Sequence, residues 1–438
     1  MIKISERACA CGRDHIFDSE VITEKSAIKK IPACVRKFNA KKVFLLADIN
    51  TYKAAGEAVC RILKSENIPY SEYIFAETAL EPDEKAVGSA IMHYDSECDL
   101  IIGVGSGVIN DIGKILSKTT GNPYIIVATA PSMDGYASAS SSMSMDGVKV
   151  SLSTRCADCI IGDIDILKQA PERMLISGIG DMLAKYISIC EWRISNLVTG
   201  EYYCEEIAAL VREALKKCVM NADGLLSRDE KAVEAVFSGL VLGGVAMNYA
   251  GISRPASGVE HYFSHVWDMR GLEFGTKVDF HGIQCAAGTM YAAKIYEKLK
   301  NYIPDREKAL KYVSDFDYER YKQKLRAFLG KGADTMILLE EKEQKYDRQK
   351  HRDRLDVIIK NWDRIIEIIN NEVPSVSELE ELYKTINMPV SASGLGIDEG
   401  IVSDTFEVTK DIRDKYVLSR LCWDLGVLNE AKEYLRCN

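Results

Sequence analysis

The strongest constraint on the fold is the alternation of apolar strands and helical segments in the first 165 residues. Strands are expected at residues 42–47, 70–75, 100–104 and 124–129, with helical segments between them. The last two are apolar along almost their whole length. Strands without a polar face are typical of a parallel sheet that helices cover on both sides. The alternation therefore predicts an α/β domain with a Rossmann-like parallel sheet.

The pattern then changes twice along the chain. Residues 138–152 alternate around the turn signal Asp146-Gly147, which predicts a β-hairpin, and Cys159–Asp163 is expected to be a further short strand. From about Pro171 onward the strand signal stops and long helical patterns follow. We therefore expect an α/β domain over residues 1–168 and an all-α domain over residues 169–438.

The composition excludes several kinds of function. Among the 438 residues, 56 Lys+Arg stand against 65 Asp+Glu, and the formal net charge is −9. An acidic chain without a basic block lacks the charge pattern of a nucleic-acid-binding protein, so no nucleic-acid partner is expected. The 13 cysteines are odd in number and scattered, which favours reduced thiols in a reducing compartment over a disulfide scaffold.

Neither a signal peptide nor a membrane span is expected. The opening residues MIKISERACACGRDH contain no apolar core followed by a cleavage site. Residues 235–252 are apolar, but they include four glycines, an asparagine and a tyrosine, with charged residues close upstream. This composition favours a closely packed, buried helix over a membrane span. We therefore expect a cytoplasmic protein.

A glycine-rich turn joins the third expected strand to a helix. Residues 105–111 read Gly105-Ser106-Gly107-Val108-Ile109-Asn110-Asp111. Glycines let the backbone approach a ligand closely, and the first N–H groups of a helix can donate to phosphate oxygens. Val108 stands where the dinucleotide-binding fingerprint has its third glycine, so a tight connection without a ligand stays an alternative. The turn predicts a dinucleotide cofactor, NAD(H) or NADP(H).

Polar groups follow two other expected strands. Asp48 comes after the first strand, where a carboxylate can accept hydrogen bonds from the hydroxyls of an adenosine ribose. An aspartate in this position is also often just a helix N-cap. The run Thr129-Ala130-Pro131-Ser132 follows the fourth strand. Ligands of open α/β sheets gather at the carboxyl ends of the strands, so both groups are candidates for cofactor binding.

Three of the six histidines lie within 21 residues, at His261, His265 and His281. His261 and His265 are four residues apart and share one face if the segment is helical. His281 precedes a glycine and a long helical pattern, so it is expected at a helix start. Imidazoles from separate elements can bind one metal, and a carboxylate would complete a three-ligand site with an open position. Ordinary polar or core histidines are the alternative.

Two cysteine groups are further candidates for structural zinc. They are Cys156 with Cys159, and Cys9 and Cys11 with His15. Each group lacks a second matching pair of ligands, which makes either one a weaker candidate than the histidines.

Four motifs in order resemble those of sn-glycerol-1-phosphate dehydrogenases. This family belongs to a larger group with glycerol dehydrogenases, iron-containing alcohol dehydrogenases and dehydroquinate synthases. The resemblance covers residues 40–300 well, and its motifs are Gly105–Asp111, Thr129–Ser138, Gly178–Lys185 and Arg254–His261. It implies a dehydroquinate synthase-like fold, in which residues 1–168 bind the dinucleotide and residues 169–438 bind the metal and the substrate. A homodimer or a higher homo-oligomer is also expected.

The resemblance also implies roles for individual residues. Asp181 matches the metal-ligand aspartate of the family, next to the substrate, with His261 and His281 as the other metal ligands. Asp134 and His265 are implied at the substrate as the catalytic pair. The residues implied to line the dinucleotide are Gly107–Asp111, Thr129–Ser132 and Ser138. The metal is a divalent ion, either zinc, nickel or iron.

These residue types fit the reduction of a ketone by hydride. The reaction places negative charge on the substrate oxygen, where a divalent metal acts as a Lewis acid. Asp134 can hydrogen-bond a substrate hydroxyl. His265 can hold the substrate or pass a proton to the alkoxide through water, since a histidine ordinarily titrates near neutrality.

The expected reaction is NAD(P)H-dependent reduction of the phosphorylated triose dihydroxyacetone phosphate to sn-glycerol 1-phosphate. Arg254 stands just before the metal-binding segment and could hold the substrate phosphate, unless it only pairs with a carboxylate. The alternatives are a glycerol or polyol dehydrogenase, a dehydroquinate synthase-like lyase and a non-catalytic nucleotide-binding protein. Asp181 argues against the lyase, whose family normally has a glutamate ligand at this position.

Overall fold

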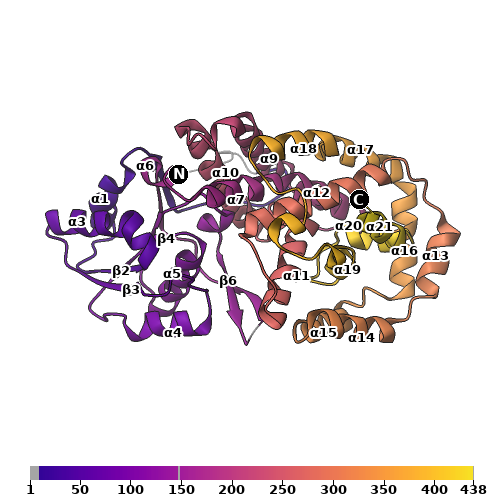
Figure 1. The fold of residues 1–438 in the computed structure, drawn as a ribbon, viewed down its shortest axis with the longest axis horizontal. Helices are drawn as coiled ribbons and strands as arrows, with labels where there is room; N and C mark the ends of the chain where they lie inside the picture. The colour runs from indigo at the N-terminus through magenta and orange to yellow at the C-terminus, as the bar shows by residue number, and fades with distance from the viewer. Residues whose placement is uncertain (1–8, 147, 438) are drawn as a thin grey trace. The chain divides into compact units, whose positions relative to one another are not determined.

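The computed structural model describes residues 9–146 and 148–437, which form two compact units (Figure 1). The α/β unit contains the chain up to Met182 and the segment Ala209–Ile252. The helical unit contains Leu183–Ala208 and the chain from Ser253 onward. The strands end at Asp163, before the predicted domain boundary at residue 168, while the segment Ala209–Ile252 packs with the strands.

The α/β unit is built on a six-stranded sheet in which all neighbouring strands run parallel. The spatial order is β1-β8-β5-β4-β2-β3. The strands are β1 (Glu20–Glu24), β2 (Val43–Asp48), β3 (Tyr70–Phe75), β4 (Leu100–Gly105), β5 (Tyr124–Ala128) and β8 (Cys159–Asp163). The sheet confirms the predicted fold class, and β1 is an edge strand that the sequence analysis did not predict.

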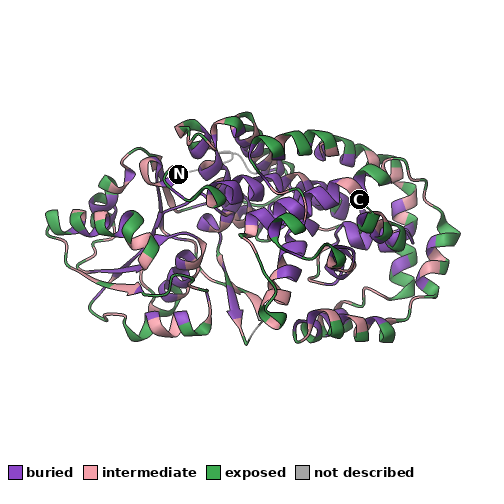
Figure 2. Cartoon of the chain, viewed as in Figure 1, coloured by how far each residue is buried: buried purple, intermediate pink, exposed green. Residues whose placement is uncertain are grey.

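Both faces of this sheet are buried (Figure 2). On one face, Leu45, Ile102 and Val127 belong to a core cluster shared with α1 (Ile31–Lys37) and α3 (Glu57–Ser65). On the other face, the intervening strand residues are just as fully buried, among them Leu46, Ile101, Ile126 and Ile160. This double burial explains why the central strands β4 and β5 are apolar along almost their whole length, whereas the edge strands β1 and β3 keep polar residues.

The remaining helices of the α/β unit connect the strands or follow them. They are α2 (Ile49–Thr51), α4 (Glu84–Met92), α5 (Gly107–Thr120), α6 (Ile164–Leu167), α7 (Glu172–Leu183) and α10 (Glu230–Ala250), with a π-helical turn at Tyr52–Gly56. Helix α9 (Glu205–Met220) begins in the helical unit and ends in the α/β unit. Helix α5 ends before Gly121, whose φ of 77° is the left-handed conformation common at helix C-caps. The predicted hairpin is confirmed as β6 (Ser140–Met145) and β7 (Val148–Ser153).

Helix α10 contains the apolar stretch that the sequence analysis considered as a membrane span. Its length and composition would suffice to cross a membrane, with a mean hydropathy of 1.3 over 18 residues, but 67% of that window is buried within the structure. A Cβ at Gly244 would lie 2.8 Å from the carbonyl oxygen of Asp134, so only glycine permits this approach. The Asn248 amide donates to the carbonyl of Ala137. Helix α10 therefore packs against the short 3₁₀ segment Asp134–Ala137 as a core helix does.

The described residues of the helical unit contain no strand. Its helices are α8 (Lys185–Thr199), α11 (Val259–Phe274), α12 (His281–Leu299), α13 (Arg306–Ser314), α14 (Tyr318–Leu329), α15 (Gly332–Glu343), α16 (Arg348–Lys360), α17 (Trp362–Glu372), α18 (Val376–Thr385), α19 (Val402–Thr409), α20 (Leu418–Asp424) and α21 (Leu428–Cys437). The sequence of residues 172–193 has one continuous helical pattern, but the structure divides it between two helices, α7 and α8. The sequence of residues 407–417 also has a helical pattern, but α19 ends at Thr409 and the next helix begins at Leu418.

Candidate active site

The order of the strands creates a switch point between β2 and β4. From β2 the chain continues to β3 on one side, and it then crosses back to β4 on the other side. At such a point the loops after the two strands diverge and leave a crevice at the carboxyl edge, where ligands of open α/β sheets bind. The two strands end at Asp48 and Gly105, the first residues that the sequence analysis assigned to the cofactor.

The glycine-rich turn and the loop after β5 meet at this edge. Ser106 Oγ lies 2.5 Å from Ser132 Oγ, and the Tyr136 hydroxyl lies 3.3 Å from Ser106 Oγ while donating to the Ala130 carbonyl. The Ser106 side chain makes no capping hydrogen bond to α5. The first N–H groups of this helix therefore point to the edge without a side-chain cap, which suits an anionic ligand. Tyr136, which links the two segments, was missed as a site residue.

Lys114 is a second residue that the sequence analysis missed. Its side chain is fully buried, and Nζ donates to the Gly135 carbonyl and to Ser138 Oγ at 3.1 and 3.3 Å. Nζ also lies 3.3 Å from the Asp111 carboxylate. Burial raises the pKa of Asp111, and the nearby ammonium of Lys114 opposes this rise. Lys114 thus holds together two of the residues assigned to the dinucleotide, Asp111 and Ser138.

Asp48 acts as a helix cap in this structure. Its Oδ1 accepts hydrogen bonds from the N–H groups of Asn50 and Thr51 at 2.7 and 2.9 Å, and the Thr51 hydroxyl accepts from the Asp48 N–H. The cap that the sequence left open as an alternative is therefore present. A contact to a ribose stays a prediction for this residue.

Asp134 and Asp181 lie together in the α/β unit. The N–H of Asp134 donates to Asp181 Oδ2 at 2.8 Å, and Asp181 is fully buried. Helix α7 carries Asp181 and is held against the loop after β5, because a Cβ at Gly178 would lie 1.7 Å from the Pro131 carbonyl oxygen. Close packing at Gly178 therefore fixes the residue implied as a metal ligand beside a residue implied at the substrate.

The three histidines gather in the helical unit, as the sequence predicted. His261 and His265 share a face of α11, and His281 is the first residue of α12. The centroid of the His281 ring lies 5.0 Å from that of His261 and 6.2 Å from that of His265. Sequence positions up to 20 residues apart are therefore brought into one cluster by the packing of α11 against α12.

The ring nitrogens of the two proposed metal ligands are oriented by their neighbours. His261 Nδ1 lies 2.8 Å from Glu260 Oε1, and His281 Nδ1 lies 3.0 Å from Ser264 Oγ. With the hydrogen on Nδ1, the lone pair is on Nε2, which is the form that ligates a metal. Both imidazoles thus have the outer hydrogen bonds that metal-binding histidines usually have.

Cys285 is a further donor in this cluster that the sequence analysis did not assign. It lies one turn after His281 on α12, and its Sγ is 3.6 Å from His281 Nε2. Donor atoms of His261, His281 and Cys285 all lie within 4.8 Å of one another. Burial alone would raise the pKa of the thiol, but the two histidines lower it below its usual value. Two imidazoles and a soft thiol suit zinc or another late transition metal.

His265 does not have the ordinary histidine pKa that the sequence analysis assumed. Burial, together with the positive charge of Arg413, holds its pKa well below the usual value. The ring is therefore neutral near pH 7 and can donate or accept a hydrogen bond without carrying charge.

Arg254 is buried, and its guanidinium is engaged within the helical unit. Nε donates to both Glu201 oxygens at 2.9 Å, while the other nitrogens donate to the Tyr416 carbonyl and to Ser195 Oγ. The ion pair that the sequence left open is therefore present, and the contact to a substrate phosphate is untested.

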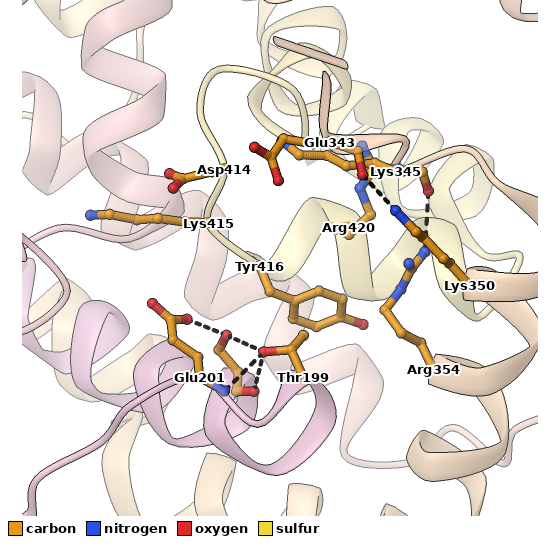
Figure 3. A pocket seen from close by; sticks show the side chains of 11 residues that line it. Thr199, Glu201, Glu343, Lys345, Lys350, Arg354, Asp414, Lys415, Tyr416 and Arg420 are labelled. Carbon is orange, nitrogen blue, oxygen red and sulfur yellow. Dashed lines mark hydrogen bonds between the residues drawn. The ribbon is translucent and has the colours of Figure 1, made fainter. Parts of the chain in front are cut away.

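Glu201 and Tyr416 also line a pocket of about 320 Å³ in the helical unit (Figure 3). Its arginines are paired with buried carboxylates. Arg354 contacts both Asp424 oxygens at 2.8 Å, and Arg420 contacts Asp411 at 2.5 Å. The charges around this pocket thus hold the helices together, and they do not identify a substrate site.

The predicted pair Cys156 and Cys159 does not form a metal-binding group among the described residues. Cys159 Sγ instead lies 3.7 Å from Cys34 Sγ, inside the α/β unit. Cys9, Cys11 and His15 do come together, and their geometry is described below.

Comparison with known proteins agrees with these features. A family model described as iron-containing alcohol dehydrogenase matches residues 22–171. A protein of Halalkalibacterium halodurans named glycerol-1-phosphate dehydrogenase (NAD(P)+) is 28% identical over 415 residues, which cover 94% of each chain. A protein of the same name from Pyrococcus furiosus is 34% identical over 281 residues, which cover 64% of this chain and 79% of that protein. The chain belongs to the glycerol-1-phosphate dehydrogenase family. The predicted family is thereby confirmed, and so is the prediction of an NAD(P)-dependent dehydrogenase.

Solved structures support the same fold for this family member. A glycerol dehydrogenase from Schizosaccharomyces pombe is 18% identical and has a TM-score of 0.61, with 97% of this chain and 92% of that chain covered. A probable glycerol dehydrogenase from Sinorhizobium meliloti 1021 is 17% identical, with a TM-score of 0.61 and coverage of 97% and 99%. At this identity the likeness concerns the fold alone.

Proposed function

We propose that this chain catalyses the reversible, NAD(P)H-dependent reduction of dihydroxyacetone phosphate to sn-glycerol 1-phosphate. The substrate follows from the names of its relatives in the family. The structural observation that carries the proposal is the cluster of His261, His265 and His281, in which both proposed ligand rings, His261 and His281, are oriented through Nδ1. A cluster of this kind suits an enzyme that stabilises an oxyanion with a metal ion.

The proposed metal ligands are His261 and His281 of the helical unit and Asp181 of the α/β unit. Two neutral imidazoles and one carboxylate leave a divalent ion with a net positive charge and an open coordination position. When bound, such an ion supplies Lewis-acid stabilisation of the substrate oxygen. Zinc, nickel and iron all accept this donor set, and Cys285 adds a soft donor next to it.

The other polar residues bind and orient the substrate. We assign Asp134 to a substrate hydroxyl, because its carboxylate is nine-tenths buried and its backbone is fixed by the hydrogen bond to Asp181. His265 remains neutral and serves as a hydrogen-bonding group that can relay a proton through water to the substrate oxygen. Asp181 faces the same substrate as a ligand of the metal.

The dinucleotide is assigned to the carboxyl edge of the sheet. The uncapped start of α5 would receive the pyrophosphate, and Gly105–Asp111 and Thr129–Ser132 would line the dinucleotide. Ser138 is included in this site because Lys114 Nζ contacts both Ser138 and Asp111. We assign Asp48 at the end of β2 to the adenosine ribose, where its carboxylate would disfavour the 2′-phosphate of NADPH.

The decisive experiment measures NADH oxidation with dihydroxyacetone phosphate, beside NAD reduction with glycerol. The proposal expects turnover of the phosphorylated triose and of sn-glycerol 1-phosphate, with far lower rates for glycerol. Preferred turnover of glycerol would make the chain a polyol dehydrogenase. Phosphate release from the seven-carbon substrate of dehydroquinate synthases, without net NADH consumption, would instead identify a lyase. The Asp134→Asn variant tests the assignment of the catalytic site, with Asp146→Asn in the exposed hairpin turn as a matched control.

We also infer that the protein works in the cytoplasm. The structure has no disulfide among the residues that it describes, although several cysteines are close together, as at Cys34 and Cys159. Persistent thiols fit a reducing compartment.

A further inference from the structure

Outside the proposed active site, the segment before β1 brings three metal-binding side chains together. Residues 9–15 read Cys9-Ala10-Cys11-Gly12-Arg13-Asp14-His15 and belong to neither a helix nor a strand. The donor atoms of Cys9, Cys11 and His15 all lie within 4.8 Å of one another. In the sequence these three residues form a short pattern that lacks a second matching pair of metal ligands. The structure adds the observation that their side chains converge.

The separation of Cys11 and His15 is close to that of two ligands on a tetrahedral zinc ion. Zinc–sulfur and zinc–nitrogen bonds of about 2.3 and 2.0–2.1 Å place two ligand atoms about 3.6 Å apart. Cys11 Sγ lies 3.3 Å from His15 Nε2, close to this distance. The Sγ of Cys9 lies within 4.8 Å of both other donors and so belongs to the same group.

The backbone of the segment is shaped around the sulfur atoms. The N–H of Cys11 donates to Cys9 Sγ at 3.5 Å, and the N–H of Gly12 closes a turn on the Cys9 carbonyl at 2.9 Å. Gly12 has a φ of 77°, which a residue with a side chain rarely adopts, so glycine is required for this turn. A backbone N–H directed at a sulfur atom stabilises the thiolate form, which is the form that binds a metal.

His15 and Arg13 both contact α10. The ring of His15 lies 5.4 Å from the Tyr249 ring, and Arg13 donates to the Ala250 carbonyl at 2.9 Å. These contacts hold the segment in the α/β unit without helix or strand hydrogen bonds. Cys9 is 7% exposed, so one ligand is already removed from water. A bound ion would add its binding free energy to the stability of this folded segment.

We propose that Cys9, Cys11 and His15 bind a structural zinc ion, separate from the metal of the active site. A further donor takes the fourth coordination position of the ion. The thiolates bound to the ion can be counted from the spectrum of the cobalt-substituted protein. A Cys9–Cys11 disulfide is the competing interpretation, because the two sulfur atoms are close together. The ion would fix the segment that leads into β1, the edge strand beside β8.

The test measures metal content per chain by elemental analysis of protein purified without added metal. Wild type should contain one more equivalent of zinc than Cys11→Ser and Cys9→Ser. Cys437→Ser, which changes an exposed cysteine far along the sequence, is the matched control and should keep the wild-type content. His15→Ala should lose the same equivalent, while His15→Cys should retain it because it replaces one ligand by another. Equal zinc content in wild type and the ligand variants would overturn the proposal.

Cobalt substitution provides a second readout that does not depend on the variants being stable. Cobalt(II) bound to wild type should show a thiolate charge-transfer band in the near ultraviolet, and its intensity should fall in Cys11→Ser but not in Cys437→Ser. A thiol count two lower than expected under non-reducing conditions, without zinc, would establish the disulfide instead. Loss of the zinc with unchanged turnover in Cys11→Ser would separate this site from the active site.

Discussion

Replacement of Arg254 by alanine should destabilise the helical unit. The guanidinium is 1% exposed, and it donates to Glu201, to the Tyr416 carbonyl and to Ser195 Oγ. Alanine removes all these hydrogen bonds and leaves the Glu201 carboxylate without its cation. The loss therefore affects α8, the residues before α11 and the residues before α20 together.

The size of the effect follows from the burial of the pair. Removing one partner of a buried ion pair costs about 3–5 kcal/mol. Glu201 has 26% of its side chain exposed, and water can solvate part of its charge, so we expect the lower end, about 3 kcal/mol. For a unit of about 200 residues, each kcal/mol shifts the Tm by roughly 2–4 °C, which gives a decrease of about 6–12 °C.

The assay combines calorimetry and urea unfolding with steady-state kinetics. Arg306→Ala is the control, because Arg306 pairs with Asp356 on the surface at 46% and 56% exposure, and its loss should cost less than about 1 kcal/mol. A double-mutant cycle with Glu201→Gln should show coupling between Arg254 and Glu201. An unchanged Tm would refute the structural role. If kcat/KM then fell about ten- to a hundredfold for dihydroxyacetone phosphate but not for dihydroxyacetone, Arg254 would bind the phosphate.

Three further predictions concern the cofactor, the metal and the helical core. Asp48→Ser should raise the use of NADPH relative to NADH with little change in Tm, because serine can still cap the helix but carries no charge. If the ratio of the kcat/KM values for NADPH and NADH did not change, Asp48 would act only as a helix cap. His281→Ala should lose the active-site metal and turnover together, as measured by elemental analysis and NADH oxidation, and full activity of metal-free enzyme would contradict the assignment. Burial lowers the pKa of Lys410 to about 8, so the unfolded chain keeps a proton that the native chain releases above that pH. The difference in the free energy of unfolding between wild type and Lys410→Met should therefore rise between about pH 8 and 10.5, by at most about 1.4 kcal/mol per pH unit. Urea titrations at several pH values measure this difference. A flat or falling difference would contradict the lowered pKa of Lys410.

Strong local patterns made most of the sheet predictable. The apolar strands β4 and β5 and the turn after β4 are encoded within a few residues each, and the structure has them where the sequence indicated. Strand β1 was missed because its sequence, Glu-Val-Ile-Thr-Glu, is short and begins and ends with charge. It is a strand only because it can pair with β8, a contact across more than a hundred residues.

The candidate site was less predictable from local sequence patterns than the sheet. The spacing of His261 and His265, and the rarity of histidine in this chain, indicated a cluster that the packing of α11 and α12 then formed. Asp181 looks like any helical aspartate, and only the family resemblance singled it out. The buried role of Arg254 depends on partners more than 50 residues away, and Lys114 reaches Gly135 21 residues away in addition to the nearby Asp111; no local pattern contains these distant contacts.

The division of the α/β unit along the chain has a consequence for its biosynthesis. The polypeptide leaves this unit at Met182 and re-enters it at Ala209, and α10 then covers Gly162 of β8 through Phe237. During translation the sheet strands are complete more than 60 residues before this helix emerges. Until then an apolar surface of the nascent sheet is exposed, which is the kind of surface that chaperones recognise. The α/β unit can therefore complete its folding only after α10 has been synthesised. By then, part of the helical unit has already been synthesised.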